Sequence, residues 1–365
     1  MVQLSWLIVT GAGASRELSS SGEPLPLMGD WSNSLIDHLE RVANGSAREL
    51  KLRRGLEGDV FEERLGDFLR WSLSLAPAKR FIGLGAETIG QPDAQVDDWF
   101  TQADRRSRDI VSAVRQTVYQ LFGQGRIDVA KSRLAYGALF NAIGITPDAP
   151  IVYATTNYDN AGEIALDQLG RPVDSGEVAS PISESHLDPK GLVEDMTPRR
   201  TPLLHLHGKV GWYRERGGRV VCHPSTSPYD ESVGVPALLL PTPDKRYEEE
   251  PAVEAIWQEF DHAIAAQPRV FVIGHSLHDV QLVDRLRRLP AQQVAVTIQF
   301  ESDVEKMIRE SSRVRELLPD AHVIPMNFGP EPVVDLASLQ NFLNNSAVPA
   351  FPQSRGSATP LPQPD

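Results

Sequence analysis

The chain has 365 residues, and its 36 Lys and Arg against 49 Asp and Glu give a formal net charge of −13. Its 41% of apolar residues is enough to build hydrophobic cores, which excludes a wholly disordered chain. At roughly 150 residues per domain, the length predicts two structural units or one large α/β domain with an insertion. The acidic balance argues against direct nucleic-acid binding, which depends on an excess of Lys and Arg.

The cysteine content and the hydropathy of the chain indicate in which cellular compartment the protein is expected. The single cysteine, Cys222, excludes internal disulfides and cysteine-rich zinc sites and fits a reducing cytosol. The first ten residues lack the positive region of a signal peptide. No apolar stretch approaches the ~18–20 residues of a membrane helix. We therefore expect a cytoplasmic protein with no membrane segment.

The N-terminal part of the chain predicts one strand followed by helices. The apolar run 4–10 ends directly at a glycine-rich motif, a pattern typical of a buried parallel strand. From residue 30 to 145, charges are dense and apolar residues recur at helical spacing, which predicts a helical insertion. Two apolar stripes carry this prediction, Ile110, Val114, Val118 and Leu121 in one and Phe61, Leu65, Phe68 and Leu69 in the other. The Gly- and Pro-rich stretch 83–92 is expected to divide the insertion.

Strand patterns return after the insertion and alternate with helical ones. The expected strands are 150–155, 203–206, 220–222, 237–240, 270–274, 294–300 and 322–325. The expected helices are 160–169, 250–266, 279–289 and 302–318. This alternation predicts an α/β fold with a Rossmann-like, doubly wound, mostly parallel sheet, formed by residues 1–29 and 146–348. The Pro-rich tail 349–365 has little to bury and is expected to be disordered.

Two glycine turns follow predicted strands. In Gly-Ala-Gly-Ala-Ser at 11–15, glycines let the backbone approach a diphosphate, and the free N–H groups of a following helix start favour an anion. A tight strand–helix turn without a ligand is the alternative, because the third glycine of the dinucleotide fingerprint is missing. Gly274 and Ser276 lie at the tip of a second such turn. Two such turns in one sheet indicate a nucleotide cleft better than either alone.

Polar residues follow two further strands. Asn157 and Asp159 are placed to contact a ligand beyond the carboxyl end of a strand, although both types also cap helices. His205 and His207 point to one face if their strand persists. They could be a metal pair, a general base or core histidines, but the spacing offers no third metal ligand.

In chain order, these motifs resemble those of bacterial sirtuin-like domains. The matching pieces are Gly-Ala-Gly-Ala-Ser at 11–15, Ser-Gly-Glu-Pro at 21–24, Thr-Thr-Asn-Tyr-Asp at 155–159, Leu-His-Gly at 206–208 and Gly-His-Ser-Leu at 274–277. The Pro-Thr-Pro-Asp-Lys turn at 241–245 is similar to the bacterial defence branch of the family.

The resemblance implies NAD binding, with NAD as the substrate. It implies that Asn157 and His207 are catalytic, His207 because it directly precedes a glycine. The NAD-binding residues it implies are Gly11, Ala12, Gly13, Ser15, Thr156, Asp159, Gly274 and Ser276. The resemblance gives no role to His205, which we interpret as a packing or supporting residue.

Two departures from the family pattern bear on the reaction. Sirtuin deacylases carry a four-cysteine zinc ribbon, which this chain cannot form, so no zinc is expected. Leu-Pro-Leu-Met at 25–28 replaces the Asp-Phe-Arg of the family. The resemblance therefore implies an NAD+ hydrolase that cleaves the nicotinamide–ribose bond and depletes NAD in anti-phage defence. An NAD-dependent protein deacylase and a non-catalytic sensor of NAD or ADP-ribose are the alternatives.

An NAD hydrolase without control would kill its host, so we expect regulation. The resemblance implies a homo-oligomer, or a separate partner such as a hexameric translocase ATPase or a short Argonaute. The predicted helical insertion is the surface that we expect to carry this control.

Overall fold

The computed structural model describes residues 4–25, 66–67, 70, 78, 94–123, 126–180, 184–197, 200–224, 227–230, 232–240, 245, 250–300 and 302–346. The apolar stripe at Phe61, Leu65, Phe68 and Leu69, the stretch 83–92 and the tail 349–365 lie outside these residues. None of the described helices is long and apolar enough to cross a membrane.

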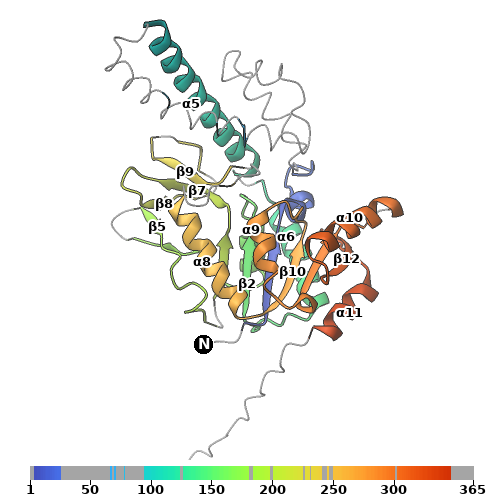
Figure 1. Cartoon of the computed structure of the whole chain (residues 1–365). Coiled ribbons are helices and arrows are strands. Elements are labelled where there is room, and N and C mark those ends of the chain that lie inside the picture. The colour runs from blue at the N-terminus through green and yellow to red at the C-terminus, as the bar shows by residue number, and fades with distance from the viewer. Residues whose placement is uncertain are drawn as a thin grey trace, which may run out of the picture.

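An eight-stranded sheet forms the centre of the described chain, in the order β13-β12-β11-β10-β1-β2-β6-β3 (Figure 1). Adjacent strands of this sheet pair in parallel, except that β12 and β13 pair antiparallel. The strands are β1 (Trp6–Thr10), β2 (Ile151–Thr155), β3 (Val173–Asp174), β6 (Thr201–His205), β10 (Arg269–Ile273), β11 (Val294–Ile298), β12 (His322–Asn327) and β13 (Val333–Val334). The predicted α/β fold with a mostly parallel sheet is therefore confirmed.

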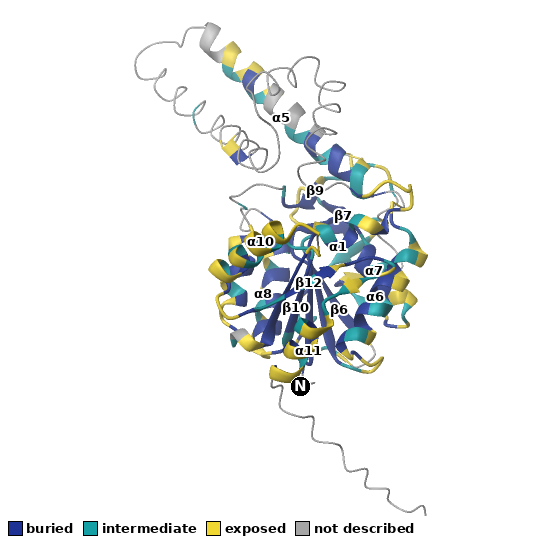
Figure 2. Ribbon diagram, turned by 90° about the vertical axis from the view of Figure 1, so that its right-hand side faces the viewer, coloured by how far each residue is buried: buried dark blue, intermediate teal, exposed yellow. Residues whose placement is uncertain are grey.

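Helices cover both faces of this sheet. One face packs against α8 (Pro251–Ala265), α9 (Val280–Leu286) and α10 (Val304–Leu317), and the other against α6 (Val129–Ile143), α7 (Ala161–Gln168) and α11 (Leu336–Asn345). Successive side chains of a strand point to opposite faces, so Leu7 and Val9 join the first core while Trp6 and Ile8 join the second. Strands β1, β2, β6 and β11 are buried at every residue, and Figure 2 shows the centre of the sheet in dark blue. Burial on both faces explains why such strands read as largely apolar runs in the sequence.

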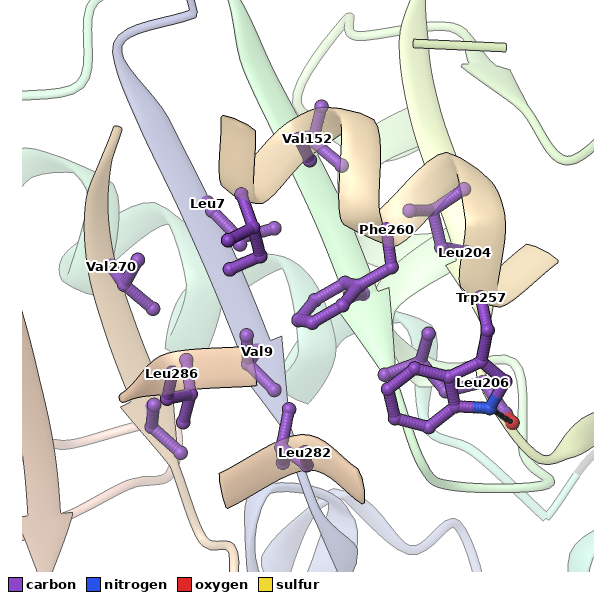
Figure 3. Close-up of a cluster of buried hydrophobic side chains, with 14 of the residues drawn as sticks. Leu7, Val9, Val152, Leu204, Leu206, Trp257, Phe260, Val270, Leu282 and Leu286 are labelled. Carbon is purple, nitrogen blue, oxygen red and sulfur yellow. Dashed lines mark hydrogen bonds between the residues drawn. The ribbon is translucent and has the colours of Figure 1, made fainter. Parts of the chain in front are cut away.

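The core under α8 offers a test of the fold. Phe260 is fully buried and lies over the sheet beside Trp257, among side chains from β1, β2 and β6 (Figure 3). Phe260→Ala is expected to lower the free energy of unfolding by about 3–5 kcal/mol, because it removes buried apolar contacts and leaves a cavity. Urea denaturation measures this loss. Gln258→Ala on the exposed side of α8 is the control, with an expected change within about 0.5 kcal/mol.

A second, five-stranded antiparallel sheet has the order β4-β5-β8-β7-β9. Its strands are β4 (Glu177–Val178), β5 (Ser185–Leu187), β7 (Gly208–Arg214), β8 (Val220–Cys222) and β9 (Val235–Leu238). The predicted strands 220–222 and 237–240 belong to this sheet rather than to the parallel one. The buried ammonium of Lys209 on β7 lies 2.9 Å from both Glu163 on α7 and Glu177 on β4, and so links this sheet to a helix that covers the parallel sheet.

Two described helices fall within the range predicted for the insertion. Helix α5 (Ala94–Phe122) extends away from the sheets (Figure 1). Its inner end is fixed at β7, where the Tyr119 hydroxyl accepts a hydrogen bond from the Gly211 N–H at 3.1 Å. Helix α6, in contrast, packs on the parallel sheet next to α7 and contributes Tyr136 and Leu139 to its core. Both are helical, as the sequence predicts, but α6 is part of the layer that covers the sheet.

Candidate functional site

The four predicted site motifs follow four neighbouring strands. Strands β10, β1, β2 and β6 are adjacent and parallel, and their final residues lie in register, Ile273 beside Thr10, Thr10 beside Thr155, and Thr155 beside His205. The loops 11–15, 156–160, 206–208 and 274–279 therefore meet at one edge of the sheet. The chain order reverses at β1, and ligands of open α/β sheets bind at this kind of position.

The two glycine turns touch each other. The N–H groups of Gly11 and Gly13 donate to the carbonyls of Ile273 and Gly274, each at 2.9 Å. A Cβ on Gly11 would lie 2.7 Å from the Gly274 oxygen, so only glycine fits this approach. The N–H groups of both glycines are thus used within the protein, whereas the sequence predicted free donors here. Helix α1 (Ala12–Ser15) begins with Ala12, which is exposed.

Asn157 connects the loop after β2 to the loop after β1. Its side-chain amide nitrogen donates to the Gly11 carbonyl at 3.0 Å and to the Ser15 hydroxyl at 2.9 Å, and the residue is 8% exposed. Its own N–H donates to the Thr155 hydroxyl at 3.0 Å. These bonds use both amide protons of the side chain, so Oδ1 is the atom that can act on a ligand. Neighbouring Thr156 is half-buried, and its N–H donates to the Thr10 carbonyl.

Asp159 is buried beneath the same loop. Burial raises the pKa of its carboxyl group, while hydrogen bonds from the Ala161 N–H and the Ser15 hydroxyl oppose that shift. The bond from Ala161 measures 2.9 Å. Asn160 is the N-cap of α7 and makes no capping bond with its side chain, so the carboxylate of Asp159, one residue earlier, accepts the N–H of the first helical residue instead. Ser15 thereby contacts both Asn157 and Asp159, which couples the glycine loop to the loop after β2.

His207 lies in the turn after β6 and contacts Asp279. Its Nε2 is 2.7 Å from Oδ2 of Asp279, and both side chains are buried. Burial and the nearby Lys245 ammonium lower the pKa of His207, whereas Asp279 and a hydrogen bond to the Thr156 backbone oppose this shift. The net effect favours a neutral imidazole near neutral pH, the form that can accept a proton.

The backbone around His207 is held from both sides. The Leu206 N–H donates to the Thr155 carbonyl at 2.8 Å, and the Leu239 N–H donates to the His207 carbonyl at 2.8 Å. The indole N–H of Trp257 donates to the Leu206 carbonyl at 2.9 Å, drawn as a dashed line in Figure 3. Core residues of α8 therefore help to place the histidine.

His205 and His207 do not form a pair. His205 is 1% exposed and packs edge-on against Trp212, with the ring centroids 5.4 Å apart. Burial and then the Lys209 charge lower its pKa well below the usual value. The contact with Trp212 makes His205 a packing residue.

Metal binding has no support in the described part of the chain. It contains no group of three or more His, Cys, Asp or Glu side chains that could hold an ion. Cys222 is buried in β8, and burial raises the pKa of its thiol to about 12. This thiol is therefore protonated near neutral pH.

The turn after β10 contains an unusual backbone conformation. Gly274 has φ +59° and Leu277 has φ +57°, which is rare for a residue with a side chain. The Leu277 N–H donates to His275 Nδ1 at 2.8 Å, and Leu277 itself is buried in the core. Ser276 is exposed, and its carbonyl accepts a hydrogen bond from Arg313 on α10.

The site contains two charged residues that the sequence analysis did not select. In the sequence, Asp279 is only the first residue of the expected helix 279–289, and Lys245 is only the last residue of the turn 241–245. The Lys245 ammonium lies 3.4 Å from Asp279 Oδ2. An aspartate at a predicted helix start is usually a cap, so nothing in its spacing pointed to His207, 72 positions earlier.

Comparison with known proteins gives one family match and no curated relative. Residues 151–315 match a family model described as SIR2-like domain, a range that includes Asn157, His207 and Gly274. No curated protein matches the chain. The glycine loop at 11–15 lies before the matched range. The match supports a sirtuin-like domain in this chain and, with it, an activity related to NAD.

Proposed function

We propose that the protein is an NAD+ hydrolase that cleaves the nicotinamide–ribose bond to give nicotinamide and ADP-ribose. The observation that carries this proposal is the meeting of four loops at one sheet edge, with the Asn157 amide and the His207 imidazole both held there by the protein. The SIR2-like match over residues 151–315 supports NAD as the ligand. Gly11, Gly13 and Gly274 let the two glycine loops pack closely against each other at the position where open α/β sheets bind nucleotides.

The reaction depends on the positioning of the ribose and the water more than on protonation of the leaving group. Nicotinamide departs as a neutral pyridine that takes the electron pair of the glycosidic bond. A water oxygen forms the new bond to the ribose carbon. Asn157 orients that water or the ribose hydroxyls through Oδ1, and neutral His207 accepts the proton that the water loses. Binding of the distant diphosphate holds the ribose in place for this step.

Depletion of NAD in anti-phage defence is the biological role that we propose for this reaction. It requires control, and we propose a homo-oligomer or a separate protein partner as the source. Because the net charge is −13, we assign any sensing of nucleic acid to such a partner rather than to this chain.

One assay separates the hydrolase from the two other activities considered. The purified chain is incubated with NAD, and free nicotinamide and ADP-ribose are measured with and without an acetylated peptide. A hydrolase releases both products with water alone. Release only in the presence of the peptide would identify a deacylase, and binding without release would identify a sensor. Either of these last two results would contradict the proposal.

A further inference from the structure

We propose that Asp279 is the positioning residue of His207, fixing the tautomer and the orientation of its ring for proton transfer. This inference rests on the proposed NAD cleavage for its kinetic part, and its structural part is tested independently below. The starting observation is the 2.7 Å distance between His207 Nε2 and Asp279 Oδ2, with side chains only 7% and 2% exposed. So short a distance between a ring nitrogen and a carboxylate oxygen requires a proton between them.

This contact selects one form of the neutral imidazole. With the proton on Nε2 and donated to Asp279, the lone pair of the neutral ring lies on Nδ1. The Thr156 backbone, which opposes the lowering of the His207 pKa, favours the protonated ring that forms when Nδ1 accepts a proton. When the ring accepts a second proton, the nearby carboxylate stabilises the cation that forms. Because the pair is buried, water screens this interaction little. Asp279 therefore acts on both the resting and the protonated ring.

The two oxygens of Asp279 have separate roles. Oδ1 accepts the N–H groups of Gln281 at 3.0 Å and Leu282 at 3.3 Å, which caps α9, while Oδ2 faces His207. Helix α9 is anchored in the core through Leu282 and Leu286 (Figure 3). The carboxylate is thus held by two backbone hydrogen bonds on a helix that is packed in the core, and its Oδ2 is directed at the histidine ring.

The turn before Asp279 is also held in place. The positive φ of Leu277 is maintained by its buried side chain and by its hydrogen bond to His275 Nδ1. Non-glycine residues keep this conformation only where their surroundings impose it, and they cluster at functional sites. This turn places Asp279 at the N-cap of α9, directly before Val280.

Three titratable groups surround His207, and they come from two segments of the chain. Asp279 and His275 belong to the turn after β10, and Lys245 approaches Asp279 from the segment before α8. Lys245 favours the ionised form of Asp279 because it lies 3.4 Å from Oδ2. Burial lowers the pKa of His275 to about 3, so His275 is neutral and adds no competing cation near neutral pH.

The test uses Asp279→Asn in the full chain. Asparagine keeps the helix cap but carries no charge. The matched control is Asp335→Asn, because Asp335 caps α11 in the same way, with hydrogen bonds from the N–H groups of Ala337 and Ser338. For NAD cleavage we expect kcat to fall about 100-fold or more in Asp279→Asn, with KM within about threefold, and no change in Asp335→Asn.

A second readout does not depend on activity. In protein labelled with ¹⁵N-histidine, long-range ¹H–¹⁵N spectra report the tautomer and pKa of His207, whose signals are assigned by comparison with His207→Ala. The wild type should show the Nε2–H tautomer. Asp279→Asn should lose this preference and titrate at lower pH, because the charge that raises the pKa of His207 is gone.

The outcomes separate this inference from the proposed function. An unchanged His207 spectrum in Asp279→Asn, or an unchanged kcat, would overturn the positioning role. A wild-type protein that does not release nicotinamide would overturn the proposed hydrolase, while the spectra would still decide whether Asp279 controls the ring. If Asp279→Asn loses its native circular dichroism, Asp279→Ser, which also caps helices, replaces it.

Discussion

Alanine at either Asn157 or His207 is expected to abolish NAD loss while the protein stays folded. Removing the Asn157 amide takes away Oδ1, the atom placed to orient the water or the ribose. Removing the His207 ring takes away the group that accepts the proton. Loss of one such group lowers kcat by about 10²–10⁴-fold in comparable sites. Release of nicotinamide, followed by chromatography, measures the effect.

Matched variants control for the loss of an amide or an imidazole elsewhere. Asn341→Ala removes an exposed amide on α11, and His262→Ala removes a partly exposed imidazole on α8. Both controls should cleave NAD like the wild type. Thermal melts of all four variants establish that they are folded. Wild-type rates in both Asn157→Ala and His207→Ala would refute the assignment of the catalytic residues.

Gly274→Ala is expected to impair both stability and NAD binding. Its φ of +59° strains a residue with a side chain, and the added Cβ would collide with the backbone of Gly13 and Ala14 in the facing loop. Strain of this kind costs about 1–3 kcal/mol, and the collision forces the two glycine loops apart. Thermal unfolding measures the first effect, and calorimetric titration with NAD measures the second.

Gly170→Ala separates the effect of backbone strain from the effect of a collision between the two glycine loops. Gly170 also has a positive φ, +72°, but an added Cβ there meets nothing within 4 Å. This variant should lose some stability and keep its affinity for NAD. If Gly274→Ala behaves like Gly170→Ala in both measurements, the contact between the two glycine loops does not matter for binding.

The parallel sheet was predictable because its strands are buried on both faces. A strand such as 269–273 must then be apolar at every position except its ends, and such a run is easy to recognise between turns. In the second sheet, only the short apolar runs 220–222 and 237–240 carry such a signal. The longest strand of this sheet, β7, was not predicted as a strand, because Gly208–Arg214 mixes glycine, lysine and aromatic residues.

The helical insertion shows where local periodicity stops being informative. Apolar spacing correctly indicates helix for both α5 and α6. It cannot say that α6 packs on the sheet while α5 extends away from it, because both need an apolar stripe. That difference follows from the partners, the aromatic cluster near Tyr119 for α5 and the core beneath Tyr136 for α6.

Most residues of the candidate site could be selected from the sequence alone, by their type and by their place directly after a predicted strand. Glycines at 11, 13 and 274, the amide of Asn157 and the imidazole of His207 were all predicted to lie at the ends of strands, and the adjacency of β10, β1, β2 and β6 brings their loops to one edge. Only the tertiary structure decided which polar atoms meet. The contact between His207 and Asp279 arises because the turn after β6 and the turn after β10 end at the same edge of the sheet, and no local pattern encodes a distance between side chains 72 positions apart.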